Sequence, residues 1–412
     1  MNDSTTDITR RRMLITAGGA VAWTGLGGGL ALADSTEPAA KSSPGPVSDA
    51  KPLPAYAKWK DAESMIVHSA NTIETRRNAF GSSGITPVDR LFVRNNVSPP
   101  SEDIVKDPDA WKVEVSGVKS PRSFTVAELK SLGLSSVAVV LQCSGNGRGF
   151  SKHKPSGTQW TVGAAGCVIF TGVPLKAVLE ATGGMDDGMA YMTSTGGEEI
   201  PPGLDPNTIM VERSVPVSGI EDAILAWEIN GEPLPLAHGG PLRVIVPGYT
   251  GVNNVKYVKH VAFTKEQSPA RIQQNSYRFS PIGVKGTAEF DSIWEMDPKS
   301  WVTLPSDSSK PVKAGRVQIS GVAMGGMSEA KKVEVSVNGG KDWQEAQLTG
   351  PDLGKYAWRG FVLAADLKPG KYELATRVTN ADGTSQPEMR KENERGYMNN
   401  SWRDHMVTID VA

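Results

Sequence analysis

Beyond about residue 290, the apolar residues of this chain alternate with polar ones, which is the pattern of half-buried β-strands. Valines alternate over residues 333–337, the Asn-Gly-Gly sequence at 338–340 turns the chain, and the residues from Trp343 on can return as a partner strand. Residues 372–378 alternate again and lead into another turn of Asn, Asp and Gly. Several short strands with such turns predict an immunoglobulin-like β-sandwich over residues 286–412.

Residues 61–285 have a different texture, in which short apolar runs are mixed with helical stretches. The run Val137–Leu141 suits a strand buried on both faces, and it leads directly into a turn-rich loop at 142–147. A second run, Leu242–Val246, ends in Pro-Gly-Tyr-Thr-Gly. Loops that follow buried strands are where a rigid scaffold presents chemical groups. We therefore expect an α+β protein, with one large mixed domain at 61–285 followed by the sandwich.

The first 33 residues have the pattern of a targeting signal. Consecutive arginines at 10–12 precede an uncharged, glycine-containing stretch at 13–32, and Ala31-Leu32-Ala33 offers small residues for cleavage. A stretch with so many glycines is a poor membrane span, so no membrane anchor is expected. The pattern is typical of a twin-arginine export signal and predicts a periplasmic protein. Residues 34–60, which contain five prolines, are expected to form a polar lead-in.

The chain of 412 residues has only two cysteines, Cys143 and Cys167. This number excludes a disulfide-rich scaffold and a four-cysteine metal site, and neither cysteine lies in the Cys-x-x-Cys-His run that attaches c-type haem. The five histidines lack the spacing of a metal-binding pair. A formal net charge of -1 gives no basic field that would collect nucleic acid.

The two cysteines differ in their surroundings. Cys167 lies in an apolar run and is expected to be a small buried hydrophobe. Cys143 precedes Ser-Gly-Asn-Gly-Arg, where glycines let backbone approach a ligand and the amides, with Arg148, would lower the pKa of the thiol. A nucleophilic cysteine would need a base, and His153 is the nearest in sequence, without an acidic residue close by to orient it. From the residues alone, metal ligation, nucleophilic catalysis and a structural role stay open.

The eight residues at 141–148, Leu-Gln-Cys-Ser-Gly-Asn-Gly-Arg, resemble the motif around the molybdenum-binding cysteine of the sulfite oxidase family. Further segments resemble that family in the same order along the chain, namely 91–96, 160–164, 172–175, 226–243, 246–256 and 395–402. The resemblance spans roughly residues 85–412. On these motifs the chain is identified as a member of the family, most similar to its haem-free bacterial sulfite dehydrogenases.

The resemblance implies a mixed α/β molybdopterin-binding domain in which the thiolate of Cys143 binds molybdenum beside the dithiolene of the pterin, a bond that suits a soft sulfur ligand. It assigns catalytic and substrate-binding roles to Arg94, Arg148, Tyr277 and Arg395. It assigns the pterin's phosphate to Asn96, His238, Arg243 and Lys256. Each arginine taken singly would be read as a surface charge. Together, three guanidiniums and a phenol are suited to a small oxyanion.

The implied function is that of a sulfite dehydrogenase. Such an enzyme oxidises sulfite to sulfate and, having no haem of its own, passes the electrons to a soluble cytochrome c. The cofactor carries the redox chemistry while the arginines position the anion. The sandwich resembles the family's dimerisation domain, which implies a homodimer. Three departures concern the substrate pocket: Asn96 stands where several relatives have histidine, and Gly147 and Phe170 stand where vertebrate enzymes have arginine and tryptophan.

Other functions fit parts of the sequence. A sulfane dehydrogenase or a sulfoxide reductase could use the same molybdenum fold. A protein of a different class, a secreted β-sandwich binding protein, would contain Cys143 merely as a buried side chain.

Overall fold

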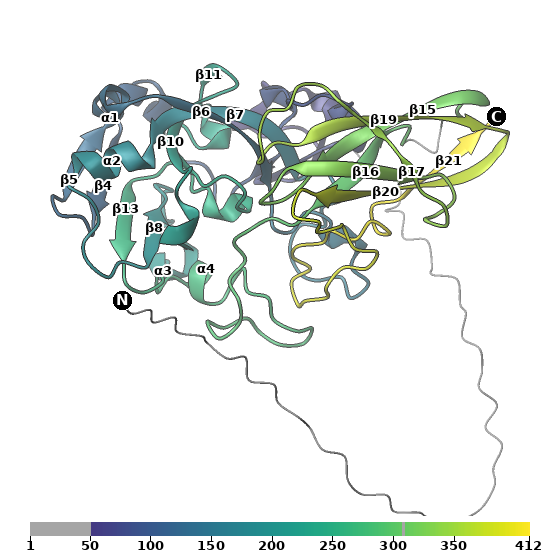
Figure 1. Ribbon diagram of the computed structural model, residues 1–412. Helices are drawn as coiled ribbons and strands as arrows, with labels where there is room; N and C mark the ends of the chain where they lie inside the picture. Colours follow the sequence, from purple (N-terminus) through teal and green to yellow (C-terminus); the bar gives the residue numbers. More distant parts are fainter. Residues whose placement is uncertain (1–50, 307–309) are drawn as a thin grey trace, which may run out of the picture. The chain divides into compact units, whose positions relative to one another are not determined.

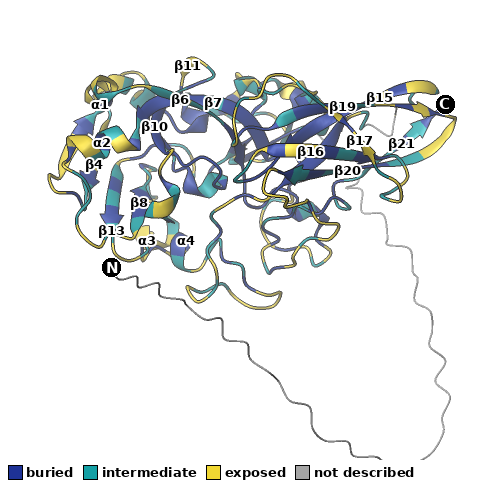
Figure 2. Cartoon of the chain, in the orientation of Figure 1, coloured by how far each residue is buried: buried dark blue, intermediate teal, exposed yellow. Residues whose placement is uncertain are grey.

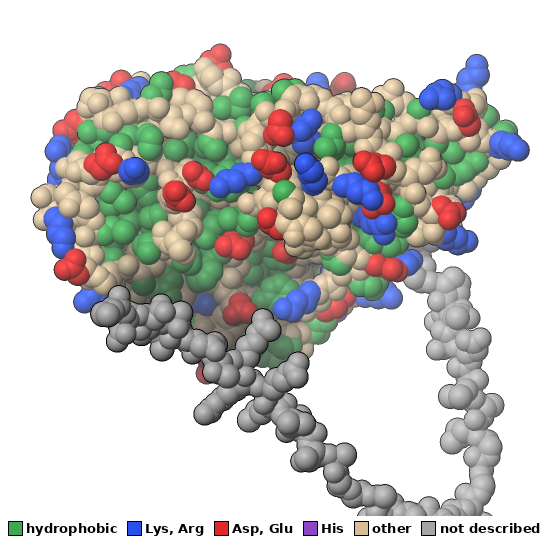
Figure 3. Space-filling view, viewed as in Figure 1, with side chains coloured by type: hydrophobic (Ala, Val, Ile, Leu, Met, Phe, Trp, Pro, Cys, Tyr) green, Lys and Arg blue, Asp and Glu red, His purple; other side chains and the backbone are tan. Residues whose placement is uncertain are grey.

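A computed structural model describes residues 51–306 and 310–412 (Figure 1). The predicted export signal at 1–33 and most of the predicted lead-in at 34–60 lie outside these residues. Among the described residues, no helix is both long and apolar enough to cross a membrane. Acidic and basic side chains are interspersed on the face seen in Figure 3, as expected from the small net charge.

The strands of the N-terminal part form three sheets. A small antiparallel sheet has the order β1 (Met65–Ser69), β2 (Thr72–Thr75), β3 (Val93–Arg94). The second sheet has the order β11 (Glu232–Pro233), β10 (Ile224–Ile229), β7 (Ala165–Pro174), β6 (Ser135–Gln142), and β12 (Arg243–Ile245) also pairs with β10. The third has the order β5 (Arg122–Thr125), β4 (Lys112–Ser116), β13 (His260–Thr264), β8 (Tyr191–Thr195), β9 (Glu212–Pro216), and β13 runs parallel to β4.

Short helices connect these strands: α1 (Val126–Leu132), α2 (Leu175–Ala181), α3 (Pro206–Ile209) and α4 (Arg271–Gln274). The start of α1 follows from its sequence, because Thr125 and Glu128 form a reciprocal capping box in which each side chain bonds the other residue's backbone amide. Helices α1 and α2 bury Val126, Leu129, Leu175 and Val178 in the core that they share with the third sheet. This mixture of sheets and short helices confirms the α+β prediction for this part.

The C-terminal part is the predicted β-sandwich, built from two antiparallel four-stranded sheets. The first has the order β14 (Lys299–Leu304), β15 (Gly315–Met324), β19 (Arg359–Leu367), β18 (Gln347–Thr349). The second has the order β17 (Gln344–Glu345), β16 (Ala330–Ser336), β20 (Gly370–Asn380), β21 (Val407–Val411). The hairpin around 338–340 is confirmed by the antiparallel pairing of β16 with β17. Alternate valines of β16 point into the sandwich core, since Val333 and Val335 are fully buried.

One cluster of buried side chains contains residues from both sides of the boundary that we predict near residue 285. Val140 and Phe150 pack in it with Trp301 and Trp358. The two parts therefore share buried apolar surface, and the position of the domain boundary stays a prediction.

Two local expectations need correction. The predicted strand at 137–141 exists as β6, but its first half is only partly buried (Figure 2). The strand is last in the sheet order, and its first half, residues 135–138, lines a cavity instead of packing fully against the core. The end of the predicted lead-in is not a polar connector, because Lys60 is only 4% exposed and its ammonium bonds the backbone carbonyls of Val88 and Leu91.

Candidate active site

Cys143 follows β6 directly and begins a tight loop. Its amide donates to the carbonyl of Ala164 at 2.9 Å, and its own carbonyl accepts from the amide of Asn146 at 2.9 Å. Gly147 has a φ of +94°, a left-handed conformation that glycine adopts at little cost, and this turn aims the next residue, Arg148, back into the molecule. The Cys143 side chain is buried but lines two cavities.

The two cavities meet at Cys143. The first, which we name the histidine cavity, has an empty volume of about 680 Å³ including space open to solvent and is lined by His238, Arg243 and Lys256. The second, the arginine cavity, has an empty volume of about 1190 Å³ including space open to solvent. Its basic lining residues are Arg94, Arg148, Arg271 and Arg395. Six residues line both cavities, namely Arg94, Asn95, Asn96, Cys143, Ile272 and Tyr277.

Arg243 and His238 form one wall of the histidine cavity. Arg243 begins β12, and its guanidinium donates to the carbonyls of Asn254 at 3.0 Å and His238 at 2.8 Å. His238 ends a short 3₁₀ helix (Leu236–His238), and its Nε2 lies 3.0 Å from the Nζ of Lys60. Two backbone carbonyls thus fix the Arg243 guanidinium, and the Lys60 side chain contacts the His238 imidazole, before any ligand is considered.

Lys256 lies across the same cavity. Its ammonium donates to Oδ1 of Asn95 at 2.5 Å and to the carbonyl of Ala237 at 2.6 Å. Gly239, with a φ of +103°, permits this packing, because a Cβ at that position would lie 2.8 Å from the Cβ of Lys256.

Burial sets the charge of the histidine cavity. Burial, and next the charge of Lys60, lower the pKa of His238 well below its usual range, so this imidazole is neutral. Burial and the charge of Arg243 lower the pKa of Lys256 well below its usual range. Glu198 is the acidic residue among the described residues that line this cavity, and burial raises its pKa to about 7. A cavity with several basic groups and one poorly ionised carboxyl favours a bound anion.

The arginine cavity is lined by four arginines and, among the described residues, by no aspartate or glutamate. Arg148 is buried, and its Nε and Nη1 donate to the carbonyls of Arg395 at 2.7 Å and Thr158 at 3.2 Å. Arg395 is exposed and donates to the hydroxyl of Ser156 at 2.7 Å. Arg94, which ends β3, makes a long contact of 3.4 Å with the amide oxygen of Asn96. These contacts orient the guanidiniums without neutralising them.

Tyr277 stands between the cavities in an unusual backbone conformation. Its φ is +52°, which costs a non-glycine residue energy and recurs at functional sites. Its ring stacks on Tyr397 with 5.2 Å between the ring centroids, and the guanidinium of Arg213 lies 5.5 Å from its ring centroid. Burial raises the pKa of Tyr277, so its phenol stays protonated and is a hydrogen-bond donor.

The structure brings all nine predicted site residues to these two cavities. The substrate set (Arg94, Arg148, Tyr277, Arg395) lines the arginine cavity. The phosphate set (Asn96, His238, Arg243, Lys256) lines the histidine cavity. Cys143 lies where the two sets meet. Their roles stay predictions.

Sequence reasoning missed several residues of the site. Asn95, rather than its neighbour Asn96, bonds Lys256, while the Asn96 amide donates to the carbonyl of Ile209 at 2.9 Å. Lys60, Arg271 and Tyr397 were missed as well. The asparagine doublet was a usable signal, whereas nothing local distinguishes Lys60 from a surface lysine.

Two other expectations about the pocket change. Phe170 is not on the wall of either cavity but is fully buried in β7, where the guanidinium of Arg243 lies 5.8 Å from its ring centroid. His153, which we considered as a base for Cys143, does have an acidic neighbour, since its Nδ1 lies 3.8 Å from a carboxylate oxygen of Glu392. Yet His153 lines neither cavity, so the geometry gives it no place beside the thiol.

The other cysteine behaves as predicted. Cys167 is fully buried, and burial raises the pKa of its thiol to about 12. Within the described parts of the chain, no group of three or more His, Cys, Asp and Glu side chains is arranged to hold a metal ion.

Comparisons with known proteins agree with this geometry. Residues 100–272 match the family described as "Oxidoreductase molybdopterin binding domain", and residues 290–411 match the "Mo-co oxidoreductase dimerisation domain". Mitochondrial sulfite oxidase of Mus musculus is 33% identical over 349 residues, which cover 80% of this chain and 62% of that protein. Sulfite oxidase of Arabidopsis thaliana is 30% identical over 371 residues, which cover 82% of this chain and 91% of that protein.

A solved structure, the sulfane dehydrogenase SoxCD from Paracoccus pantotrophus, has the same fold. Its TM-score is 0.67 at 24% identity, and the match covers 84% of this chain and 89% of that one. The chain spans 62% of the length of the mouse protein but nearly all of the plant protein. It carries a molybdopterin-binding domain followed by a dimerisation domain, and it belongs to the sulfite oxidase family.

Proposed function

We propose that this protein is a periplasmic sulfite dehydrogenase, exported by the twin-arginine route. It oxidises sulfite to sulfate at a molybdenum–molybdopterin centre and passes the electrons to an external cytochrome c. The observation that carries the proposal is the position of Cys143, where a cavity suited to a phosphorylated cofactor meets a cavity suited to a small oxyanion.

The residues of the histidine cavity fit the cofactor. Arg243 forms no salt bridge with a carboxylate among the described residues, Lys256 donates hydrogen bonds from its side-chain nitrogen, and His238 lines the same cavity as a neutral imidazole. A charged guanidinium binds phosphate with short, strong hydrogen bonds, and a bound phosphate would favour the protonated form of Lys256. When bound, the molybdenum–pterin cofactor supplies the two-electron redox chemistry and the sulfur ligands beside Cys143. A thiolate is the soft ligand that such a metal accepts.

The residues of the arginine cavity position the substrate. Arg148 is held in place by two backbone carbonyls, so the anion meets a guanidinium that is already oriented. Arg94 lies on both cavities and can bond an anion placed beside Cys143. The protonated phenol of Tyr277 donates a further hydrogen bond. Because these groups are cationic or neutral donors, they favour sulfite over an uncharged sulfoxide.

The remaining parts of the proposal rest on sequence features. Arginines at 10–12 before a glycine-rich stretch support export. The match of residues 290–411 to a dimerisation domain supports a homodimer. Neither cysteine lies in a haem-attachment run, which supports transfer of electrons to a separate protein such as cytochrome c.

A second candidate is oxidation of a larger sulfur compound. The arginine cavity is open to solvent and extends from Cys143 to Arg271 and Arg395, so an anion with an extra sulfur or an attached group could also enter it. The likeness to the sulfane dehydrogenase shows a shared fold and leaves this candidate second.

The test is a substrate panel on protein purified from a host that makes the cofactor. Metal and pterin are measured first, and about one molybdenum per chain is expected. Turnover is then measured with sulfite, thiosulfate and methionine sulfoxide, each with cytochrome c or a suitable electron donor. Fastest turnover with sulfite supports the proposal, and preference for thiosulfate supports the second candidate. Protein that takes up no molybdenum despite adequate supply would be a binding protein instead.

A further inference from the structure

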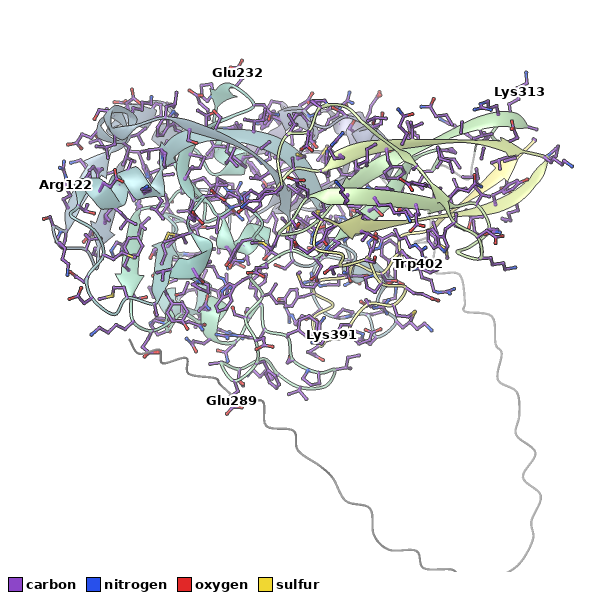
Figure 4. All side chains as sticks on the ribbon, in the orientation of Figure 1. Arg122, Glu232, Glu289, Lys313, Lys391 and Trp402 are labelled. Atoms are coloured by element: carbon purple, nitrogen blue, oxygen red, sulfur yellow. The ribbon has the colours of Figure 1, made fainter. Side chains whose placement is uncertain are left out.

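The loop that carries Cys143 is clamped from the C-terminal part of the chain. Three backbone carbonyls of that loop, those of Ser144, Asn146 and Gly147, each accept a hydrogen bond from this part. Their donors are the amide of Met398 at 2.8 Å, the ammonium of Lys299 at 3.1 Å and the side-chain amide of Asn399 at 2.9 Å. In Figure 4, Lys391 and Trp402 mark the segment that supplies Met398 and Asn399. Of the three donors, Lys299 alone can carry a charge.

Lys299 begins β14 and is only 2% exposed. Among the residues that the structure describes, its ammonium makes one hydrogen bond, to the carbonyl of Asn146, and it lies 5.9 Å from the ring centroid of Trp301. The charged or titratable groups that act on it are Asp404, Arg77, Cys143, Asp297 and His405. Asp404 is already engaged by Arg390 and by the amide of Asn399.

A buried ammonium with so few partners is costly. Burial lowers the pKa of Lys299 to about 7, although the negative charge of Asp404 acts in the opposite direction. The loss of water around the ammonium therefore outweighs the attraction of the carboxylate. A neutral side chain such as glutamine would satisfy the Asn146 carbonyl without that cost. The hydrogen bond to Asn146 alone therefore does not explain why a lysine occupies this position.

We infer that Lys299 is a positioning residue that fixes the Cys143 loop and whose charge stabilises the electron-rich, reduced form of the centre bound at Cys143. The inference rests on the proposed function, in which Cys143 binds a redox-active metal. A positive charge held near such a centre favours the form with more electrons, so it raises the reduction potential. For a unit charge on the order of 10 Å away and an effective dielectric constant of about 20, Coulomb's law gives roughly a tenfold effect on the equilibrium.

The experiment is a redox titration of the metal centre in the holoenzyme at about pH 6, below the pKa of about 7 that burial gives Lys299, so that this side chain is charged. Lys299→Gln keeps a donor for the Asn146 carbonyl but removes the charge, whereas Lys299→Arg keeps the charge. The control is Lys331→Gln, which removes an equal charge from an exposed position of the sandwich. We expect Lys299→Gln to keep its molybdenum and to disfavour reduction about tenfold, seen as a lower midpoint potential. Lys299→Arg and Lys331→Gln should titrate close to the parent.

An unchanged midpoint potential in Lys299→Gln overturns the inference, because a purely structural lysine would be replaced by the glutamine donor. If Lys299→Gln loads no metal, Asp404→Asn decides, since removing this carboxylate should raise the potential, and an unchanged value overturns the inference. A parent protein that binds no molybdenum overturns the proposed function and this inference with it. A parent that binds molybdenum, with no response to either charge change, overturns the inference alone.

Discussion

The packing of Arg148 against glycine makes a sharp test of its role. A Cβ added at Gly145 would lie 2.6 Å from Nη2 of Arg148 and 2.7 Å from its Cζ. Real Cβ contacts are not this short, so the guanidinium must move. The backbone at Gly145 is not left-handed, so alanine adds no conformational strain there. Gly145→Ala therefore displaces the guanidinium while Arg148 and Cys143 themselves stay unchanged.

The expected magnitude follows from the hydrogen bonds that the displaced guanidinium loses. Movement breaks its alignment with the carbonyls of Arg395 and Thr158 and with a bound oxyanion. One misplaced charge-assisted hydrogen bond costs about 1.5–3 kcal/mol. This corresponds to roughly a ten- to hundredfold loss in kcat/KM. Most of the loss should be a raised KM, because the charge already attracts the anion in the ground state.

The assay is steady-state oxidation of sulfite at saturating acceptor, with the molybdenum content of each sample measured. Gly84→Ala is the matched control, since a Cβ there would meet only Leu353, at an ordinary 3.7 Å, and it should be silent. Parental kcat and KM in Gly145→Ala, at full molybdenum content, would refute the reasoning that the guanidinium of Arg148 binds the substrate.

Three further predictions address the ligand, the export signal and stability. Cys143→Ser should keep the pterin but lose nearly all turnover, because serine is a harder ligand, whereas Cys167→Ser should stay active. Pterin fluorescence and sulfite assays check this. Parental turnover in Cys143→Ser would exclude Cys143 as the ligand. Replacing Arg10 and Arg11 with Lys should leave the protein in the cytoplasm, and normal periplasmic activity after fractionation would exclude the twin-arginine route. Burial lowers the pKa of Lys60 from 10.5 to about 7, so between these pH values the unfolded state binds more protons and the free energy of unfolding should rise with pH. In urea unfolding, the free energy of unfolding of Lys60→Met should rise less steeply with pH than that of the parent. An equal slope would contradict the burial argument.

Sequence reasoning succeeded where the signal is local. The hairpin at 338–340 was predictable because a turn of Asn and Gly between alternating valines fixes both the reversal and the register. The loop after β6 was predictable for a similar reason, since an apolar run followed by glycines ends a strand and begins a turn.

The arrangement of the site was not predictable from local patterns. Arg94, Arg148, Arg271 and Arg395 are far apart in sequence, and only tertiary pairing brings them to one cavity. The resemblance to a known family supplied three of these arginines, and Arg271 was missed because it belongs to none of the motifs. Lys60 and Lys299 were missed because a buried lysine has the same sequence signature as a surface lysine, so its environment emerges only from long-range packing.

The central claim is that the thiolate of Cys143 binds molybdenum where the two cavities meet. X-ray absorption at the molybdenum edge tests it most directly, with the parent compared with Cys143→Ser at equal metal content. The account predicts that the metal in Cys143→Ser loses one sulfur neighbour and gains an oxygen, while the pterin's sulfur neighbours remain. An unchanged sulfur shell in Cys143→Ser would contradict the account.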